Sequence, residues 1–135
     1  MANPIYVLDS FALMAHFGGE QGGQKVLELL EQAESDEITL AMSLINVGEL
    51  IYLMSREQGR KKAETMLDDL QILPILFFDA TEERIIASAW IKSEYAVSYA
   101  DSFAISLTQE LNAILVSGDP EFESIEHIVK MLWLK

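Results

Sequence analysis

The residues of this chain whose types and spacing could do chemistry are four acids, Asp9, Glu49, Asp101 and Asp119. Asp9 directly follows a short apolar run, and Asp119 lies just beyond another. Glu49 and Asp101 lie in mostly apolar stretches, where an unpaired acid is costly. Carboxylates that converge repel one another and cannot all stay ionised without a cation. Oxygen ligands without His or Cys nearby favour Mg²⁺ or Mn²⁺, and such ions assist phosphodiester hydrolysis.

Each of these acids also has a purely structural interpretation. Asp9 is a good helix N-cap, and Asp119 suits the turn that Ser117 begins. Asp101 fits the first turn of a helix, where the helix dipole favours acids. The chain has 22 Asp and Glu residues, and most acids are solvated surface charges. The functional interpretation therefore depends on whether the fold brings the four acids together.

The elements that must position these acids alternate between strands and helices. Apolar runs predict strands at Ile5–Leu8, Ile38–Met42, Ile75–Phe78, Ala113–Val116 and, at an edge, Ile128–Leu134. Helical spacing fills the intervals, for example at Phe11–Phe17 and Tyr99–Leu111. This alternation favours one α/β domain over residues 1–135, with a mainly parallel central sheet flanked by helices. Ligands in such folds bind at the carboxyl ends of the strands, so we expect the acids to converge there.

The helix that carries Glu49 is predicted to begin at a Ser43 N-cap and to end or break at Gly59. Its apolar stripe is predicted to be Leu44, Val47, Ile51 and Met54, with Asn46 and Glu49 off the stripe.

Composition narrows the function classes. The absence of Cys excludes disulfide scaffolds, thiolate zinc sites and cysteine nucleophiles. With 9 Lys and Arg against 22 acids, the net charge of −13 argues against a generally basic nucleic-acid surface. Contact with nucleic acid would need cations or a local basic patch. The chain lacks both a transmembrane run and a signal-peptide pattern, so we expect a cytoplasmic protein without a membrane partner.

One basic cluster interrupts the acidic sequence. It comprises Arg56, Arg60, Lys61 and Lys62, around the predicted junction at Gly59. The cluster is interpreted as a solvated face, as a phosphate-contacting patch, or as a dock for an acidic partner segment. Lys92 is a lone candidate of the same kind.

Four motifs in order along the chain resemble those of a known family. They are Ile5–Ser10, Asn46–Leu50, Tyr99–Ala104 and Val116–Phe122. Together they make the chain similar to PIN-domain nucleases, and most of all to the small, single-domain VapC-type toxins of prokaryotic toxin–antitoxin pairs. The resemblance spans essentially the whole chain and implies a PIN-like α/β/α sandwich.

The resemblance implies an endoribonuclease that depends on Mg²⁺ or Mn²⁺ and cleaves single-stranded RNA. Asp9, Asp101 and Asp119 would be the metal-facing catalytic acids, and Glu49 a ligand directly or through water. Ser117 takes the place of a small hydroxyl residue that orients the first acid in relatives. Asn46, one turn before Glu49, would contact the metal ligands rather than the metal. A small antitoxin protein and a second copy of the chain are the partners implied.

Two alternatives remain open at this point. The positive mean hydropathy of +0.19 suggests apolar surface that a partner covers, as in a catalytically silent, PIN-like interaction module. The segments 44–54 and 66–70 would then form the groove. A DNA-directed nuclease of the same fold is disfavoured by the small size of the chain.

Overall fold

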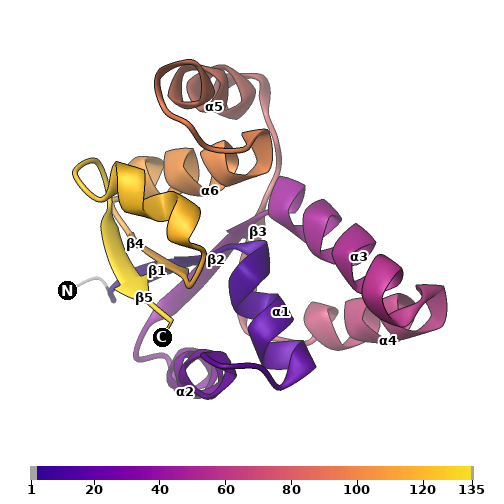
Figure 1. Cartoon of the computed structure of the whole chain (residues 1–135). Helices are drawn as coiled ribbons and strands as arrows, with labels where there is room; N and C mark the ends of the chain where they lie inside the picture. The colour runs from indigo at the N-terminus through magenta and orange to yellow at the C-terminus, as the bar shows by residue number, and fades with distance from the viewer. Residues whose placement is uncertain (1–2, 135) are drawn as a thin grey trace.

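A computed structural model describes residues 3–134, which fold around one five-stranded sheet (Figure 1). The strands are β1 (Ile5–Leu8), β2 (Thr39–Ser43), β3 (Ile75–Phe78), β4 (Ile114–Ser117) and β5 (Lys130–Trp133). Their order across the sheet is β3-β2-β1-β4-β5, and every neighbouring pair is parallel. The predicted α/β fold with a parallel central sheet is confirmed, and the last segment does form an edge strand.

Six α-helices and one 3₁₀ helix cover this sheet within the described residues. They are α1 (Ser10–Gly18), α2 (Gly23–Glu34), α3 (Leu44–Gln58), α4 (Arg60–Gln71), α5 (Glu82–Glu94), α6 (Tyr99–Glu110) and η1 (Pro120–Ile125). Helices α1 to α4 lie on one side of the sheet, and α5, α6 and η1 lie on the other (Figure 1). The molecule is therefore a three-layer α/β/α sandwich. No described helix has the length and apolar character needed to cross a membrane.

Two hydrophobic cores separate the layers, and strand alternation assigns residues to them. On β1, Leu8 belongs to the core under α1 to α4, whereas Val7 belongs to the core under α6 and η1. On β4, Val116 and Leu115 divide in the same way. All four side chains are fully buried, as expected for a parallel sheet covered on both faces.

The buried face of α3 differs from the predicted stripe. Val47 and Met54 are buried, but Leu44 is 42% exposed and Asn46 is completely buried. Apolar residues occupy much of the circumference of this helix, so their spacing alone did not identify its inner face. Packing against α6 decides it, because the Asn46 amide donates a hydrogen bond (3.0 Å) to the backbone carbonyl of Ala100.

Both ends of α3 follow the prediction. The Ser43 hydroxyl accepts a hydrogen bond from the Ile45 amide (3.2 Å) and caps the helix. Gly59 separates α3 from α4 with φ at +91°, a conformation that L side chains rarely adopt. The two helices therefore form a hairpin that projects away from the sheet (Figure 1).

Candidate active site at the carboxyl edge of the sheet

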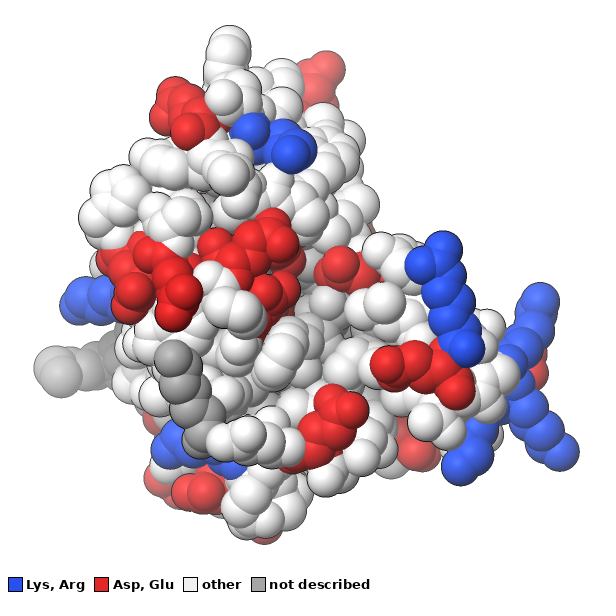
Figure 2. Space-filling model, in the orientation of Figure 1, with Lys and Arg blue, Asp and Glu red and all other residues white. Residues whose placement is uncertain are grey.

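An acidic cleft of about 340 Å³ opens at the carboxyl edge of the sheet. It is bordered by the first turn of α1 after β1, by the start of η1 after β4, by the start of α6, and by the side of α3. Its lining residues are Asp9, Ser10, Phe11, Met14, Glu20, Glu49, Leu53, Glu57, Ser98, Asp101, Asp119 and Glu121. Figure 2 shows the acidic side chains gathered over the middle of this face. The structure therefore brings all four acids singled out from the sequence into one cleft.

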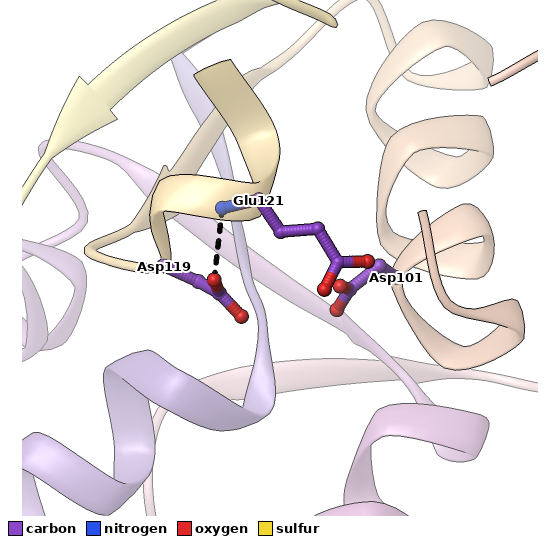
Figure 3. A group of neighbouring side chains, drawn as sticks. All are labelled: Asp101, Asp119 and Glu121. Carbon is purple, nitrogen blue, oxygen red and sulfur yellow. Dashed lines mark hydrogen bonds between the residues drawn. The ribbon is translucent and has the colours of Figure 1, made fainter. Parts of the chain in front are cut away.

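Three of the acids point into the cleft because each one lies at the N-terminal end of a helix. Asp9 is the N-cap of α1, and its Oδ1 accepts a hydrogen bond from the Ala12 amide (2.9 Å). Asp119 is the N-cap of η1, and its Oδ1 accepts from the Glu121 amide at 2.9 Å (Figure 3). Asp101 lies in the first turn of α6. Helix starts meet at this edge, so capping and site interpretations hold together.

Asp101, Asp119 and Glu121 form the tightest group of carboxylates. Each offers one oxygen, and these three oxygens lie within 4.8 Å of one another. Figure 3 shows the Glu121 and Asp101 carboxylates pointing toward each other, with Asp119 beside them. The sequence analysis missed Glu121. Its signal was a second acid, two residues after Asp119, at the start of what proves to be η1.

Asp9 and Glu49 line the same cleft beside that group. The pKa of the Asp9 carboxyl is raised to about 7, mainly by burial and to a smaller extent by the charges of Asp119 and Glu49. Hydrogen bonds from the Ser117 hydroxyl and the Ala12 amide act in the opposite direction. Glu49 Oε1 accepts a hydrogen bond from the Ser10 hydroxyl (2.6 Å), which ties α3 to the start of α1.

Asp101 shows the same crowding more strongly. The pKa of its carboxyl is raised to about 8, mainly by burial, with further contributions from the charge of Glu121 and a hydrogen bond shared with it. The charges of Asp9 and Glu49 contribute as well. Two of the acids therefore resist ionisation in the metal-free protein. A set of convergent carboxylate oxygens that repel one another suits a hard divalent cation.

Ser117 and Asn46 contact this site in different ways. The Ser117 hydroxyl bonds to Asp9 and also accepts a hydrogen bond from the Asp119 amide (3.0 Å), so it touches two acids. Asn46 makes no hydrogen bond to Asp9 or Asp119 within the described residues. It bonds instead to the carbonyl of Ala100, the residue before Asp101, so it fixes α6 against α3.

Two serines that the sequence analysis did not assign also hold the acids in place. The first is Ser10, which donates to Glu49. The second is Ser98, whose hydroxyl caps α6 at the Asp101 amide (3.0 Å) and whose own amide donates to the Glu121 carboxylate. The signal for Ser98 was a Ser three residues before an acid at a helix start, which is typical of a capping box.

The basic cluster lies away from the acids, at the α3–α4 end of the molecule (Figure 2). Arg56 stacks over the Tyr52 ring at 5.0 Å, and Arg60 pairs with Glu64 in an exposed salt bridge of 3.6 Å. Lys61 and Lys62 line a separate, mostly apolar cavity of about 390 Å³. Lys92 is an exposed residue near the end of α5, outside the acidic cleft.

A chain of cavities joins the acidic cleft to those lysines. An intermediate cavity shares Met14, Glu20 and Glu57 with the cleft. It also shares Phe17, Met54 and Lys62 with the lysine-lined cavity. The three cavities therefore adjoin in one continuous groove between α1 and the α3–α4 hairpin. It runs from the acidic cleft through a stretch with both charged and apolar side chains to a mostly apolar end that carries Lys61 and Lys62.

Comparisons with known proteins agree with this geometry. The model of the PIN domain family matches residues 6–128, which is nearly the whole chain. A search of curated protein sequences found no match.

Solved structures share the fold at low identity. VapBC2 from Rickettsia felis, bound to a DNA fragment from its promoter, is 20% identical with a TM-score of 0.74, over 97% of this chain and 99% of that one. A toxin–antitoxin complex from Klebsiella pneumoniae is 15% identical (TM-score 0.69, 96% and 98% covered). The sarcin–ricin-loop-cleaving toxin VapC20 from Mycobacterium tuberculosis is 15% identical (TM-score 0.70, 87% and 92% covered).

Proposed function

Since the chain belongs to the PIN domain family, we propose that it is a metal-dependent endoribonuclease that cleaves single-stranded RNA, the toxin of a toxin–antitoxin pair. The observation that carries the proposal is the convergence of Asp9, Glu49, Asp101, Asp119 and Glu121 in one cleft. The similarity to the sarcin–ricin-loop-cleaving toxin from M. tuberculosis and to toxin–antitoxin complexes supports the same assignment.

The carboxylates of Asp9, Asp101 and Asp119 would hold Mg²⁺ or Mn²⁺, joined by Glu121 and, directly or through water, by Glu49. A divalent ion held by these carboxylates would supply an activated water for phosphodiester hydrolysis and would offset charge at the leaving oxygen. The surrounding hydroxyls keep the acids in position for this. Ser117 orients Asp9, Ser10 holds Glu49, and Ser98 fixes both Asp101 and Glu121.

A small antitoxin protein is the partner that the continuous groove suits. A segment with a basic end would match the acidic cleft, and an opposite end with apolar and acidic side chains would match Phe17, Met54, Lys61 and Lys62. Charge reversal of both lysines to Glu tests this role. It should weaken binding of the cognate partner by about 10-fold and leave RNA cleavage unchanged. Loss of cleavage with intact partner binding would assign the lysines to phosphate contact instead.

We propose that a second copy of the chain binds at the exposed apolar residues of α5 and of the edge strand β3. Trp90 is 67% exposed and Leu76 is 58% exposed, and Ile86 on α5 is half exposed. Exposed large apolar side chains are the surface that a partner protein would cover. Trp90→Ser should convert a dimer to a monomer in sedimentation experiments, whereas an unchanged sedimentation coefficient would reject this interface.

The cytoplasm is the compartment that we propose for the reaction.

Cleavage of a fluorogenic single-stranded RNA in Mn²⁺ tests the enzyme itself. We expect cleavage that stops with EDTA and with Asp101→Asn, and that survives in Asp68→Asn, a matched exchange at an exposed position on α4. Absence of both cleavage and Mn²⁺ binding would reject the nuclease and favour a silent interaction module.

A further inference from the structure

Phe11 is the only aromatic residue among the described residues that line the acidic cleft. Its side chain lies in the first turn of α1, two residues after Asp9, and the residue is 37% exposed. Neither hydrophobic core includes it among its described members, although its neighbours Ala12 and Leu13 are fully buried core residues. Phe11 thus contributes apolar surface to the cleft rather than to the core.

The ring of Phe11 packs against Gly118, in the loop that carries Asp119. A Cβ atom on Gly118 would lie 2.5 Å from Phe11 Cε1 and 2.9 Å from Cζ, so only glycine permits this approach. The same Cβ would lie 2.7 Å from the backbone carbonyl oxygen of Leu134, so a side chain at this position would clash with backbone as well as with the ring. The ring therefore packs against the residue before Asp119 and lines the cleft together with Asp9 and Asp119.

The charge of the cleft gives an exposed aromatic ring a possible role in holding RNA. The chain carries a net charge of −13, and no Lys or Arg lines the cleft in the part of the chain that the structure describes. Phosphates can be held at the acids by the cation, but the walls offer them no positive charge. Base stacking on an aromatic ring does not depend on charge and tolerates every base.

We propose that Phe11 positions the RNA by stacking on the base of a nucleotide that flanks the cleaved bond. This inference rests on the proposed ribonuclease function and deepens it, because it names what holds the substrate. Phe11 is a substrate-positioning residue, and the acids alone carry the chemistry.

A coupling experiment between protein and substrate tests the stacking. A short single-stranded RNA with one mapped cleavage site is compared with copies that carry an abasic ribose on either side of that site. Phe11→Leu retains apolar bulk against Gly118 but removes the ring, and Phe11→Tyr retains the ring. Melting temperature and Mn²⁺ binding are measured for each variant, so that a folding defect is separated from a loss of stacking.

With intact RNA, we expect Phe11→Leu to lower kcat/KM roughly 5- to 150-fold, and Phe11→Tyr to stay near wild type. One abasic substrate should show the same loss with the wild-type enzyme, and Phe11→Leu should then cause no further loss. This non-additivity is the signature of direct contact, which a merely structural residue would not produce.

Two results would overturn the stacking while leaving the nuclease intact. One is that wild-type cleavage is indifferent to both abasic positions, which needs no variant to observe. The other is that Phe11→Leu causes an equal loss with intact and abasic RNA. Failure of the wild-type protein to cleave any RNA would overturn the proposed function and the stacking together.

Discussion

Two cavities of similar size lie at opposite edges of the same sheet and differ in their chemistry. The acidic cleft at the carboxyl edge has a volume of about 340 Å³ and the amino-edge cavity about 300 Å³. The amino-edge cavity is lined by Pro4, Ile5, Thr108, Gln109, Asn112, Ala113, Ile114, Ile128, Val129 and Lys130. Lys130 is the one charged residue among these described lining residues, and no acid accompanies it.

The difference follows from which ends of the helices meet at each edge. At the carboxyl edge α1 and η1 begin, and their free amides bind the capping carboxylates of Asp9 and Asp119. At the amino edge α6 ends, and the free groups there are carbonyls, which cannot bind a carboxylate. The similar volumes of the two cavities therefore say little about their functions. The helix ends around a cavity determine which side chains it can hold.

The largest effect expected from this comparison is the loss of cleavage in Asp101→Asn. The exchange keeps the shape of the side chain but removes the charge of a member of the tightest carboxylate group. We expect kcat/KM in Mn²⁺ to fall more than about 100-fold, since removing even an outer partner of a metal ligand costs about 10- to 100-fold. Asn112→Asp at the amino edge, which adds an acid there, should leave cleavage unchanged. Equal losses of cleavage in the two variants would contradict the conclusion that only the carboxyl edge is catalytic.

Metal addition should stabilise the protein through the carboxyl edge alone. At a free Mn²⁺ concentration about 100 times its dissociation constant, the free energy of unfolding should rise by about 2.7 kcal/mol. Asp119→Asn should abolish most of that increase, and Lys130→Gln should retain it. Thermal melts with and without Mn²⁺ measure both. A full increase in Asp119→Asn would place the metal elsewhere.

The pH dependence of the metal-free protein should reveal the crowded acids. Asp9 and Asp101 have folded pKa values raised from 3.8 to about 7 and about 8, so the folded state binds more protons than the unfolded state. The free energy of unfolding should therefore fall as the pH rises from about 4 to about 8, and then level off.

Asp9→Asn isolates one of these two acids and keeps a side-chain oxygen for the Ala12 amide. At pH 8 without metal it should raise the free energy of unfolding by roughly 1–2 kcal/mol, or about 3 to 10 °C in melting temperature. At pH 4 the gain should vanish. Denaturant titrations at the two pH values provide the measurement, and a gain that grows toward low pH would contradict the assigned cause.

The sequence predicted a mainly parallel sheet and the edge to which the acids come, because the alternation of strands and helices is a local pattern. Asp9 and Ser43 could be placed as caps for the same reason. The contributions of Asn46 and Glu121 could not be predicted. The position of Asn46 depends on how α3 packs against α6, and that of Glu121 on its hydrogen bond from the Ser98 amide. Both depend on contacts between segments that are distant in sequence.

The smallest effect is expected from Asn112→Gly, which tests whether the amino edge is only structural. Asn112 has φ at +51°, in the left-handed region that glycine enters without strain. Relief of that strain favours the variant, while the extra freedom of glycine in the unfolded chain opposes it, so the free energy of unfolding should change by less than about 0.5 kcal/mol. Cleavage and the Mn²⁺ stabilisation should both match wild type. A change in either one would mean that the amino edge communicates with the acids through α6, because that helix begins beside Asp101 and ends just before Asn112.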